Sequence, residues 1–97
     1  MEVVAEGNAL AIRSYFPDGS YRAQATIRVN MNYPDEMYEV YGWFKDNTEH
    51  RYERMGLLSP EKWGFNPNNF RSCYGTALAF VALHGGGVVV SPSITLF

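Results

Sequence analysis

The sequence predicts an α+β fold in which an antiparallel β-meander of three to five strands packs against one long helix in the C-terminal half, followed by a final strand. Three observations lead to this prediction. Residues 9–28 alternate in polarity around a turn signal, residues 70–83 repeat apolar side chains at helical spacing, and residues 88–97 are mostly β-branched and apolar. A chain of 97 residues has the usual length of one domain, so residues 1–97 are expected to form a single unit.

The clearest predicted element is a β-hairpin centred on Asp18-Gly19, a dipeptide that favours two-residue hairpin turns. With this loop, residues that face each other across the two strands share the same polarity. One face holds the pairs Phe16–Tyr21, Ser14–Ala23, Ile12–Ala25 and Leu10–Ile27, and the other holds Tyr15–Arg22, Arg13–Gln24, Ala11–Thr26 and Ala9–Arg28. The first face is expected to be buried and the second to point outward.

A further strand is predicted at residues 38–44, where apolar side chains again alternate along the chain. In a meander, the buried face gains Tyr38, Val40 and Phe44, and the outward face gains Tyr41 and Trp43. Residues 46–55 allow two interpretations. They form either a short helix that begins with a capping box at Asp46 or another strand, and the strand is favoured.

A short helix and a long helix are predicted in the second half of the chain. Ser59-Pro60-Glu61-Lys62 is typical of a single capped helical turn. Asn66-Pro67 is expected to open the main helix, because Asn is a good N-cap and Pro is tolerated at the first helical position. This helix should run to about His84, with Gly85 in the left-handed conformation beyond its end.

Apolar side chains surround the main helix. One stripe consists of Phe70, Cys73, Tyr74, Ala77, Leu78 and Val81, and the other side carries Ala79, Phe80, Ala82 and Leu83. A helix that is apolar all round is buried on more than one side, and one sheet covers only one of them. A second subunit is therefore expected to cover part of this region, which makes the chain a homo-oligomer. The predicted interface residues are Phe80, Leu83, Val89 and Phe97.

Charged residues are absent from the C-terminal quarter of the sequence. Every Lys, Arg, Asp and Glu lies between Glu2 and Arg71. A membrane-spanning helix needs about 20 predominantly apolar residues. Gly85-Gly86-Gly87 and Pro92 interrupt the uncharged run, so we expect a buried helix and strand there and no membrane insertion.

The composition limits the class of partner and the compartment. A net charge of −2 does not give the basic footprint of a nucleic-acid-binding protein. Cys73 is the only cysteine, so no intramolecular disulfide forms and a reducing compartment, the cytoplasm, is expected. The first residues lack the basic and apolar regions of a secretory signal peptide. Aromatic residues make up 15% of the chain, and aromatic side chains are enriched at binding surfaces.

The outward sheet face is the main candidate for a ligand site. Its members are Arg13, Tyr15, Arg22, Gln24, Arg28, Tyr41 and Trp43. Guanidinium groups and flat rings bind phosphates and bases by bidentate hydrogen bonding and stacking, so a nucleotide or another small anion would suit this face. The alternative, which we favour for these residues taken alone, is a solvated face whose arginines pair with Glu39 and other acids.

Catalytic and metal sites are weakly supported. Cys73 lies in the second turn of the helix, where the helix dipole lowers a thiol pKa, but His84 is about 16 Å further along the same helix. His50 could approach Cys73 only through tertiary folding, so a structural role for the cysteine is favoured. His84 is explained by the helix C-terminus, which favours imidazolium. One Cys and two His match no zinc spacing, and neither a metal nor a cofactor is expected.

Three functions remain for the chain, in this order. The first is a small non-enzymatic protein-interaction module that acts as a homo-oligomer, by analogy an accessory inhibitor of the kind carried by phages or mobile elements. The second is a binder of a small anionic ligand, such as a nucleotide, through the outward sheet face. The third is an enzyme that depends on Cys73.

Overall fold

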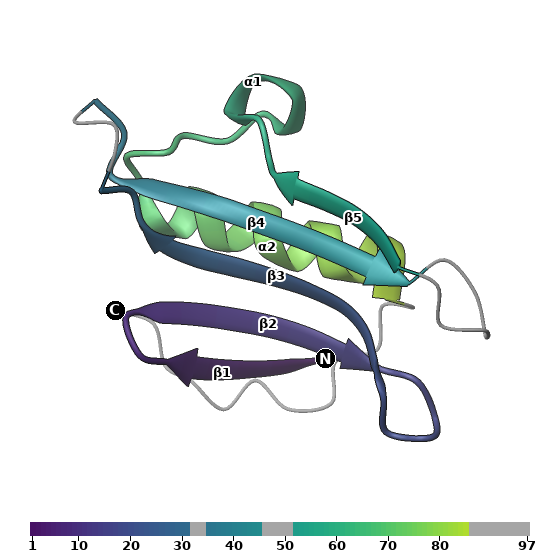
Figure 1. Cartoon of the computed structure of the whole chain (residues 1–97). Coiled ribbons are helices and arrows are strands. Elements are labelled where there is room, and N and C mark those ends of the chain that lie inside the picture. Colours follow the sequence, from purple (N-terminus) through teal and green to yellow (C-terminus); the bar gives the residue numbers. More distant parts are fainter. Residues whose placement is uncertain (32–34, 46–51, 86–97) are drawn as a thin grey trace.

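The computed structural model describes residues 1–31, 35–45 and 52–85. Its elements are β1 (Glu2–Glu6), β2 (Ala9–Tyr15), β3 (Tyr21–Val29), β4 (Tyr38–Lys45), β5 (Tyr52–Leu57), α1 (Pro60–Trp63) and α2 (Phe70–Gly85). The strands form one antiparallel sheet in the order β1-β2-β3-β4-β5. Figure 1 shows α2 crossing one face of this sheet, where it packs on β2, β3 and β4. The predicted α+β meander on one long helix is confirmed, and the predicted strand at residues 88–97 lies outside the described residues.

The first strand, β1, has no counterpart in the sequence analysis. It pairs with β2 in the antiparallel sense, so that Val3 lies opposite Ile12. Gly7 has a φ of 57°, which lets the chain reverse tightly between the two strands. Val3 is buried and joins the core, which explains why this short segment is held against the sheet.

The register of the β2–β3 hairpin is confirmed away from its loop. The observed pairs are Ser14–Ala23, Arg13–Gln24, Ile12–Ala25, Ala11–Thr26, Leu10–Ile27 and Ala9–Arg28. The two predicted pairs next to the loop are wrong, because Tyr15 pairs with Tyr21 and leaves Arg22 as an extra residue in β3. This irregularity is a β-bulge, which re-aims the side chains beside it.

The loop itself is longer than the predicted two residues. The Phe16 N–H donates to the Ser20 carbonyl at 2.8 Å, and the Gly19 N–H donates to the Phe16 carbonyl at 2.9 Å. The Asp18 carboxylate accepts hydrogen bonds from both the N–H and the hydroxyl of Ser20, at 2.9 and 2.6 Å. These local bonds stabilise a turn that spans Phe16 to Ser20 and displace the shorter turn expected from Asp18-Gly19.

The next two strands follow the favoured interpretations. β4 covers the predicted residues 38–44 and pairs with β3. β5 is a strand at Tyr52–Leu57, so that part of the ambiguous segment is not helical, while residues 46–51 lie outside the described residues. The predicted single turn is α1, where the Ser59 Oγ accepts from the Lys62 N–H at 3.4 Å and Gly64 ends the helix with a φ of 70°.

The start of α2 differs from the prediction at Asn66-Pro67. The helix begins at Phe70, and the N-cap is Asn69, whose Oδ1 accepts the Ser72 N–H at 2.9 Å. The Asn66 side chain instead accepts the Asn68 N–H at 2.9 Å in a turn. The Pro67 carbonyl accepts from the Tyr38 N–H at 2.9 Å, so this stretch is tied to the start of β4 and cannot be helical as well.

The end of α2 also differs from the prediction. Gly85 is still helical, is buried, and does not adopt the left-handed conformation. A Cβ at this position would collide with the Ser14 hydroxyl of β2. Gly85 is therefore needed because the helix end lies directly on the sheet, and not because the backbone turns there.

The core lies between α2 and the sheet, and Phe80 is at its centre. Phe80 is fully buried and packs on Phe44 and Trp63, with ring centroids 6.3 and 5.6 Å away. Its ring lies on Gly42 of β4, where an added Cβ would be 2.6 Å from the Phe80 Cζ. The missing side chain of Gly42 thus provides the space that the Phe80 ring occupies.

The side of α2 that faces away from the sheet is open. Gly75, Ala79, Ala82 and Leu83 are exposed, although the sequence predicts burial on more than one side.

Within the described ranges, no helix has the length and apolar character to cross a membrane.

Candidate functional site

The face of the sheet opposite α2 carries the predicted ligand residues. We call it the open sheet face, because Figure 1 shows no labelled helix on this side. Cross-strand pairing places Arg13 beside Gln24, and Gln24 beside Trp43. The same ladder places Thr26 between Ala11 and Tyr41. The structure thus brings together on one surface Arg13, Tyr15, Arg22, Gln24, Arg28, Tyr41 and Trp43.

Arg28 is held by two partners from β4. Its Nε donates to the Glu39 Oε1 at 2.7 Å, and its guanidinium carbon lies 4.0 Å from the centre of the Tyr41 ring. The hydrogen bond to Glu39 raises the pKa of Arg28, with smaller contributions from Tyr41. The charge of Arg28 is therefore balanced inside the chain.

Arg13 is also balanced and is more enclosed. Its Nη2 forms an ion pair with the Glu6 carboxylate, and its Nε donates to the Gln24 Oε1 at 2.9 Å. Gln24 in turn donates to the Thr26 hydroxyl at 3.0 Å, which extends the hydrogen-bonded row. Burial opposes the charged form of Arg13, but the hydrogen bond and charge of Glu6 outweigh it and raise the pKa.

An aromatic cluster of Tyr15, Tyr21 and Trp43 covers the hairpin end of the face. Tyr21 meets Tyr15 edge to face at 5.2 Å and lies 6.4 Å from Trp43, measured between ring centroids. Tyr15 and Tyr21 are 38% and 40% exposed. The Tyr15 hydroxyl donates to the Glu2 Oε1 at 2.5 Å, and this bond raises the Tyr15 pKa. Sequence reasoning assigned Tyr21 to the buried face, because the bulge that turns it outward has no signal in the alternation.

Arg22 differs from the other two arginines of the open sheet face. Its guanidinium carbon lies 5.4 Å from the centre of the Phe16 ring. Among the side chains that the structure describes, no carboxylate lies within ion-pair distance of Arg22. Arg22 therefore presents a positive charge next to the aromatic cluster, and a partner could neutralise it.

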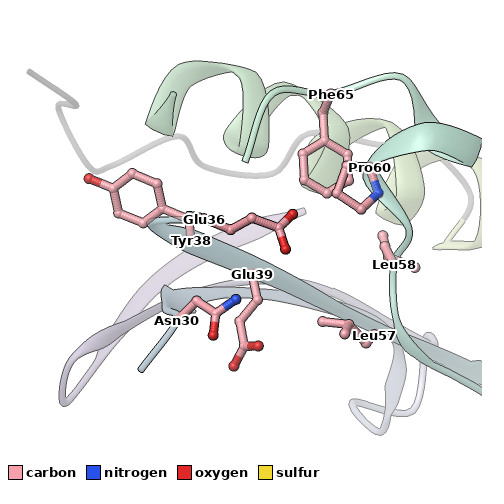
Figure 2. Close-up of a pocket in the computed structure, with 8 residues that line it drawn as sticks. All are labelled: Asn30, Glu36, Tyr38, Glu39, Leu57, Leu58, Pro60 and Phe65. Carbon is pink, nitrogen blue, oxygen red and sulfur yellow. The ribbon is translucent and has the colours of Figure 1, made fainter. Parts of the chain in front are cut away.

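Two hollows of the described surface lie away from the aromatic cluster. Figure 2 shows one of about 40 Å³ lined by Asn30, Glu36, Tyr38, Glu39, Leu57, Leu58, Pro60 and Phe65. It has room for a few water molecules only, whereas sites for small organic ligands usually measure about 300–1,000 Å³. The carboxylates and the phenol of this hollow point in different directions in Figure 2. A wide, open hollow of about 490 Å³ lies at the strand ends around Ala9, Val29 and Met31, and its one charged side chain is the ion-paired Arg28.

Cys73 has the surroundings of a core residue. It is fully buried, and its thiol donates to the Asn66 carbonyl at 3.6 Å. Burial raises the pKa of the thiol, which is the opposite of what a nucleophilic cysteine needs. His50, which only tertiary folding could bring near Cys73, lies outside the described residues.

His84 is held by aromatic rings rather than by the charge of the helix end. Its ring stacks on Phe44 with a centroid distance of 4.0 Å and an angle of 3° between the planes, and Phe80 lies 4.7 Å away. Burial lowers the pKa of His84, so the neutral ring is favoured over the predicted imidazolium. In the part of the chain that the structure describes, no group of three or more His, Cys, Asp or Glu side chains could hold a metal ion.

The predicted interface residues separate in the structure. Phe80 is a core residue and cannot contact a second subunit, because the helix packs it against Gly42 of the sheet. Leu83, one turn further along the same helix, is 69% exposed. Val89 and Phe97 lie outside the described residues.

Comparison with protein-family models, with curated proteins and with solved structures found no match to this chain. Its function is therefore inferred from its own surfaces.

Proposed function

We propose that this chain is a non-enzymatic protein-interaction module that binds a partner protein through the open sheet face. The observation that carries the proposal is the aromatic cluster beside Arg22, whose guanidinium has no carboxylate partner among the described side chains. Tyr, Trp and Arg are the residue types that contribute most to protein–protein binding energy, and they do so where they cluster.

The shape of the face supports a protein rather than a small molecule. Tyr15 and Tyr21 are 38% and 40% exposed, and neither of the two hollows described above lies at the aromatic cluster, so a small ligand there would stay largely in water. A protein surface, in contrast, can cover the whole cluster and exclude water from it. The internal bonds of Arg13 and Arg28 hold neighbouring side chains in place, which lowers the entropy lost on binding.

The charges of the face define the partner further. Glu2, Glu6 and Glu39 contact residues of this face and would repel a polyanion such as nucleic acid. Arg22 supplies one positive charge beside aromatic rings, and one carboxylate is enough to neutralise it. The partner surface therefore presents an isolated Asp or Glu carboxylate among apolar side chains. An inhibitor protein of the kind that phages carry would act in this way, in the reducing cytoplasm that the lone thiol of Cys73 suits.

Differential capture tests the proposal. The wild-type chain, Tyr21→Ala, Arg22→Glu and the control Lys62→Ala are immobilised separately and exposed to a lysate of the source cells or their host. Lys62 is an exposed cation on α1, so its removal changes charge without touching the open sheet face. We expect a protein that is retained by the wild type and by Lys62→Ala and is lost by both face variants. Retention of the same proteins by all four chains would contradict the proposal.

Melting temperatures measured with a panel of nucleotides test the alternative that the open sheet face binds a small anion. Millimolar ATP, AMP and inorganic phosphate should leave the melting temperature unchanged, because ligand binding to the folded state would raise it. A rise that disappears in Arg22→Glu would assign the open sheet face to a small anion instead of a protein.

A further inference from the structure

The aromatic cluster of the open sheet face rests on a fixed base. The Arg13 guanidinium lies over the Tyr21 ring, with its carbon 5.0 Å from the ring centre, and the Arg13 side chain is only 12% exposed. Glu6 of β1 forms an ion pair with Arg13. Glu2 of the same strand accepts a hydrogen bond from the Tyr15 hydroxyl. The Tyr15 and Tyr21 rings are therefore ordered before a partner arrives, and binding costs less conformational entropy.

The position of the cluster in the sheet excludes strand addition as the mode of binding there. Tyr15, Tyr21 and Trp43 belong to β2, β3 and β4, each of which has a neighbouring strand on both sides. An added strand pairs with the free backbone groups of a sheet edge, and β1 and β5 form the two edges of the described sheet. A partner therefore contacts the aromatic cluster at its side chains alone.

The shape of the cluster does not suit a partner helix. A helix binds to another protein by inserting the apolar residues of one face into a hydrophobic groove. Neither of the two hollows described above lies at the cluster, and the rings of Tyr15 and Tyr21 are exposed. A segment that fits these rings has to present flat apolar groups along an extended backbone.

Arg22 adds a requirement for hydrogen-bond acceptors. Its guanidinium has no carboxylate partner among the described side chains, and it carries more N–H donors than one carboxylate can accept. Once a partner excludes water, each remaining donor needs an acceptor. A helix uses its backbone carbonyls internally, whereas a polyproline II segment leaves all of its carbonyls free.

Proline satisfies the aromatic cluster and Arg22 together. It has no backbone N–H, so a proline packed on a tyrosine ring buries no unsatisfied donor. Its flat apolar ring suits aromatic surfaces, and the polyproline II helix is already formed before binding, which lowers the entropy lost. The carbonyls of the same segment accept hydrogen bonds, which the donors of Arg22 require.

We infer that the open sheet face binds a proline-rich segment of its partner in the polyproline II conformation, with one Asp or Glu of that segment opposite Arg22. The inference rests on the proposed function and names the element of the partner that is recognised. Prolines pack on Tyr15 and Tyr21, the carboxylate neutralises Arg22, and backbone carbonyls accept from its other N–H groups.

Calorimetric titration of the full chain with blocked proline decapeptides tests the inference. Each peptide carries one aspartate, and the peptides differ only in its position. We expect the wild type and the control Lys62→Ala to bind at least one of them, and Tyr21→Ala, with folding checked by circular dichroism, to bind it at least tenfold more weakly. The same peptide with serine in place of every proline should also bind at least tenfold more weakly. No binding by the wild type at millimolar peptide, or equal binding of the serine peptide, overturns the inference.

Exchanging the charges tests the position of the carboxylate. The wild type should bind the aspartate peptide at least tenfold more tightly than the same peptide with lysine at that position, and Arg22→Glu should have the opposite preference. Both peptides are measured on one folded variant, so a loss of stability cannot produce this reversal. If Arg22→Glu still prefers the aspartate peptide, the acid does not lie opposite Arg22 and the inference fails.

The lysate capture separates this inference from the proposed function. The peptide that binds best should displace the protein captured by the wild-type chain. If a protein is captured through Tyr21 and Arg22 but no proline peptide binds, the proposed function stands and the proline-rich segment is excluded. If a proline peptide binds but capture does not depend on these two residues, the proline site stands and the proposed binding of the captured protein at this face is wrong.

Discussion

At the scale of single residues, two of the three arginines on the open sheet face form ion pairs with acids of the same chain. Arg28 is paired with Glu39 and Arg13 with Glu6, which is the pairing expected for a solvated sheet face. Alternation along the strands predicts which side each arginine points to, but it contains no information on its partners. Arg22 is set apart only by the bulge, a feature that depends on the Asp18 turn and leaves no trace in the polarity pattern.

Gly42 provides a test of the core at this scale. Gly42→Ala places a Cβ 2.6 Å from the Phe80 ring, and overpacking of this kind destabilises a protein by about 1–3 kcal/mol. We expect a lower free energy of unfolding in urea for Gly42→Ala. Gly75→Ala is the matched control, because the same added methyl group meets open space there and should stabilise the helix by up to about 1 kcal/mol. Equal effects at the two positions would refute the packing described for Phe80.

His84 predicts a pH dependence of stability. Its pKa in the folded chain lies below the ordinary value of 6.5, because burial against Phe44, on which the ring stacks, and Phe80 removes water from the ring. The unfolded chain therefore binds a proton first as the pH falls. Stability from this residue is complete above about pH 6.5 and is lost as the pH falls toward the folded pKa. Urea titrations between pH 8 and pH 5 should show a shallower loss of stability for His84→Phe than for the wild type, and parallel curves would contradict this account.

At the scale of elements, the sequence predicts the strands and helices better than their ends. The hairpin register follows from alternation, since a shift by one residue would expose Ile12 and Ile27. The start of α2 does not follow, because Asn66 and Asn69 are equally good N-caps in the sequence. A distant contact decides between them, the hydrogen bond from the Tyr38 N–H to the Pro67 carbonyl. The sequence does not predict β1, because the strand is short and its polar and apolar residues do not alternate clearly.

Asn69→Ala tests where α2 begins. Removing the side chain that accepts the Ser72 N–H should lower the free energy of unfolding by about 1 kcal/mol, the usual effect of losing an N-cap. Asn69→Asp keeps an acceptor at the helix N-terminus and serves as the control, with a stability close to that of the wild type. If Asn69→Ala unfolds at the wild-type urea concentration, the helix does not depend on this cap.

At the scale of the whole molecule, the fold separates two surfaces with different chemistry. The open sheet face carries Tyr, Trp and Arg, and the side of α2 that faces away from the sheet exposes Gly75, Ala79, Ala82 and Leu83. The sequence predicts both sets, but it cannot show that Phe80 is buried while Leu83 is exposed, because the helix is apolar all round and the two residues are neighbours on its surface. Only the packing of Phe80 on Gly42 distinguishes the core side from the open one.

The measurement that tests the central claim most directly is calorimetric titration of the captured partner, once purified, into the wild-type chain and into Arg22→Glu. Reversing the charge of Arg22, the arginine of the open sheet face that has no carboxylate partner among the described side chains, should weaken binding by at least about tenfold, or about 1.4 kcal/mol, with unchanged folding. Lys62→Glu should bind as tightly as the wild type. Equal affinity of Arg22→Glu and the wild type would show that the partner does not bind on the open sheet face.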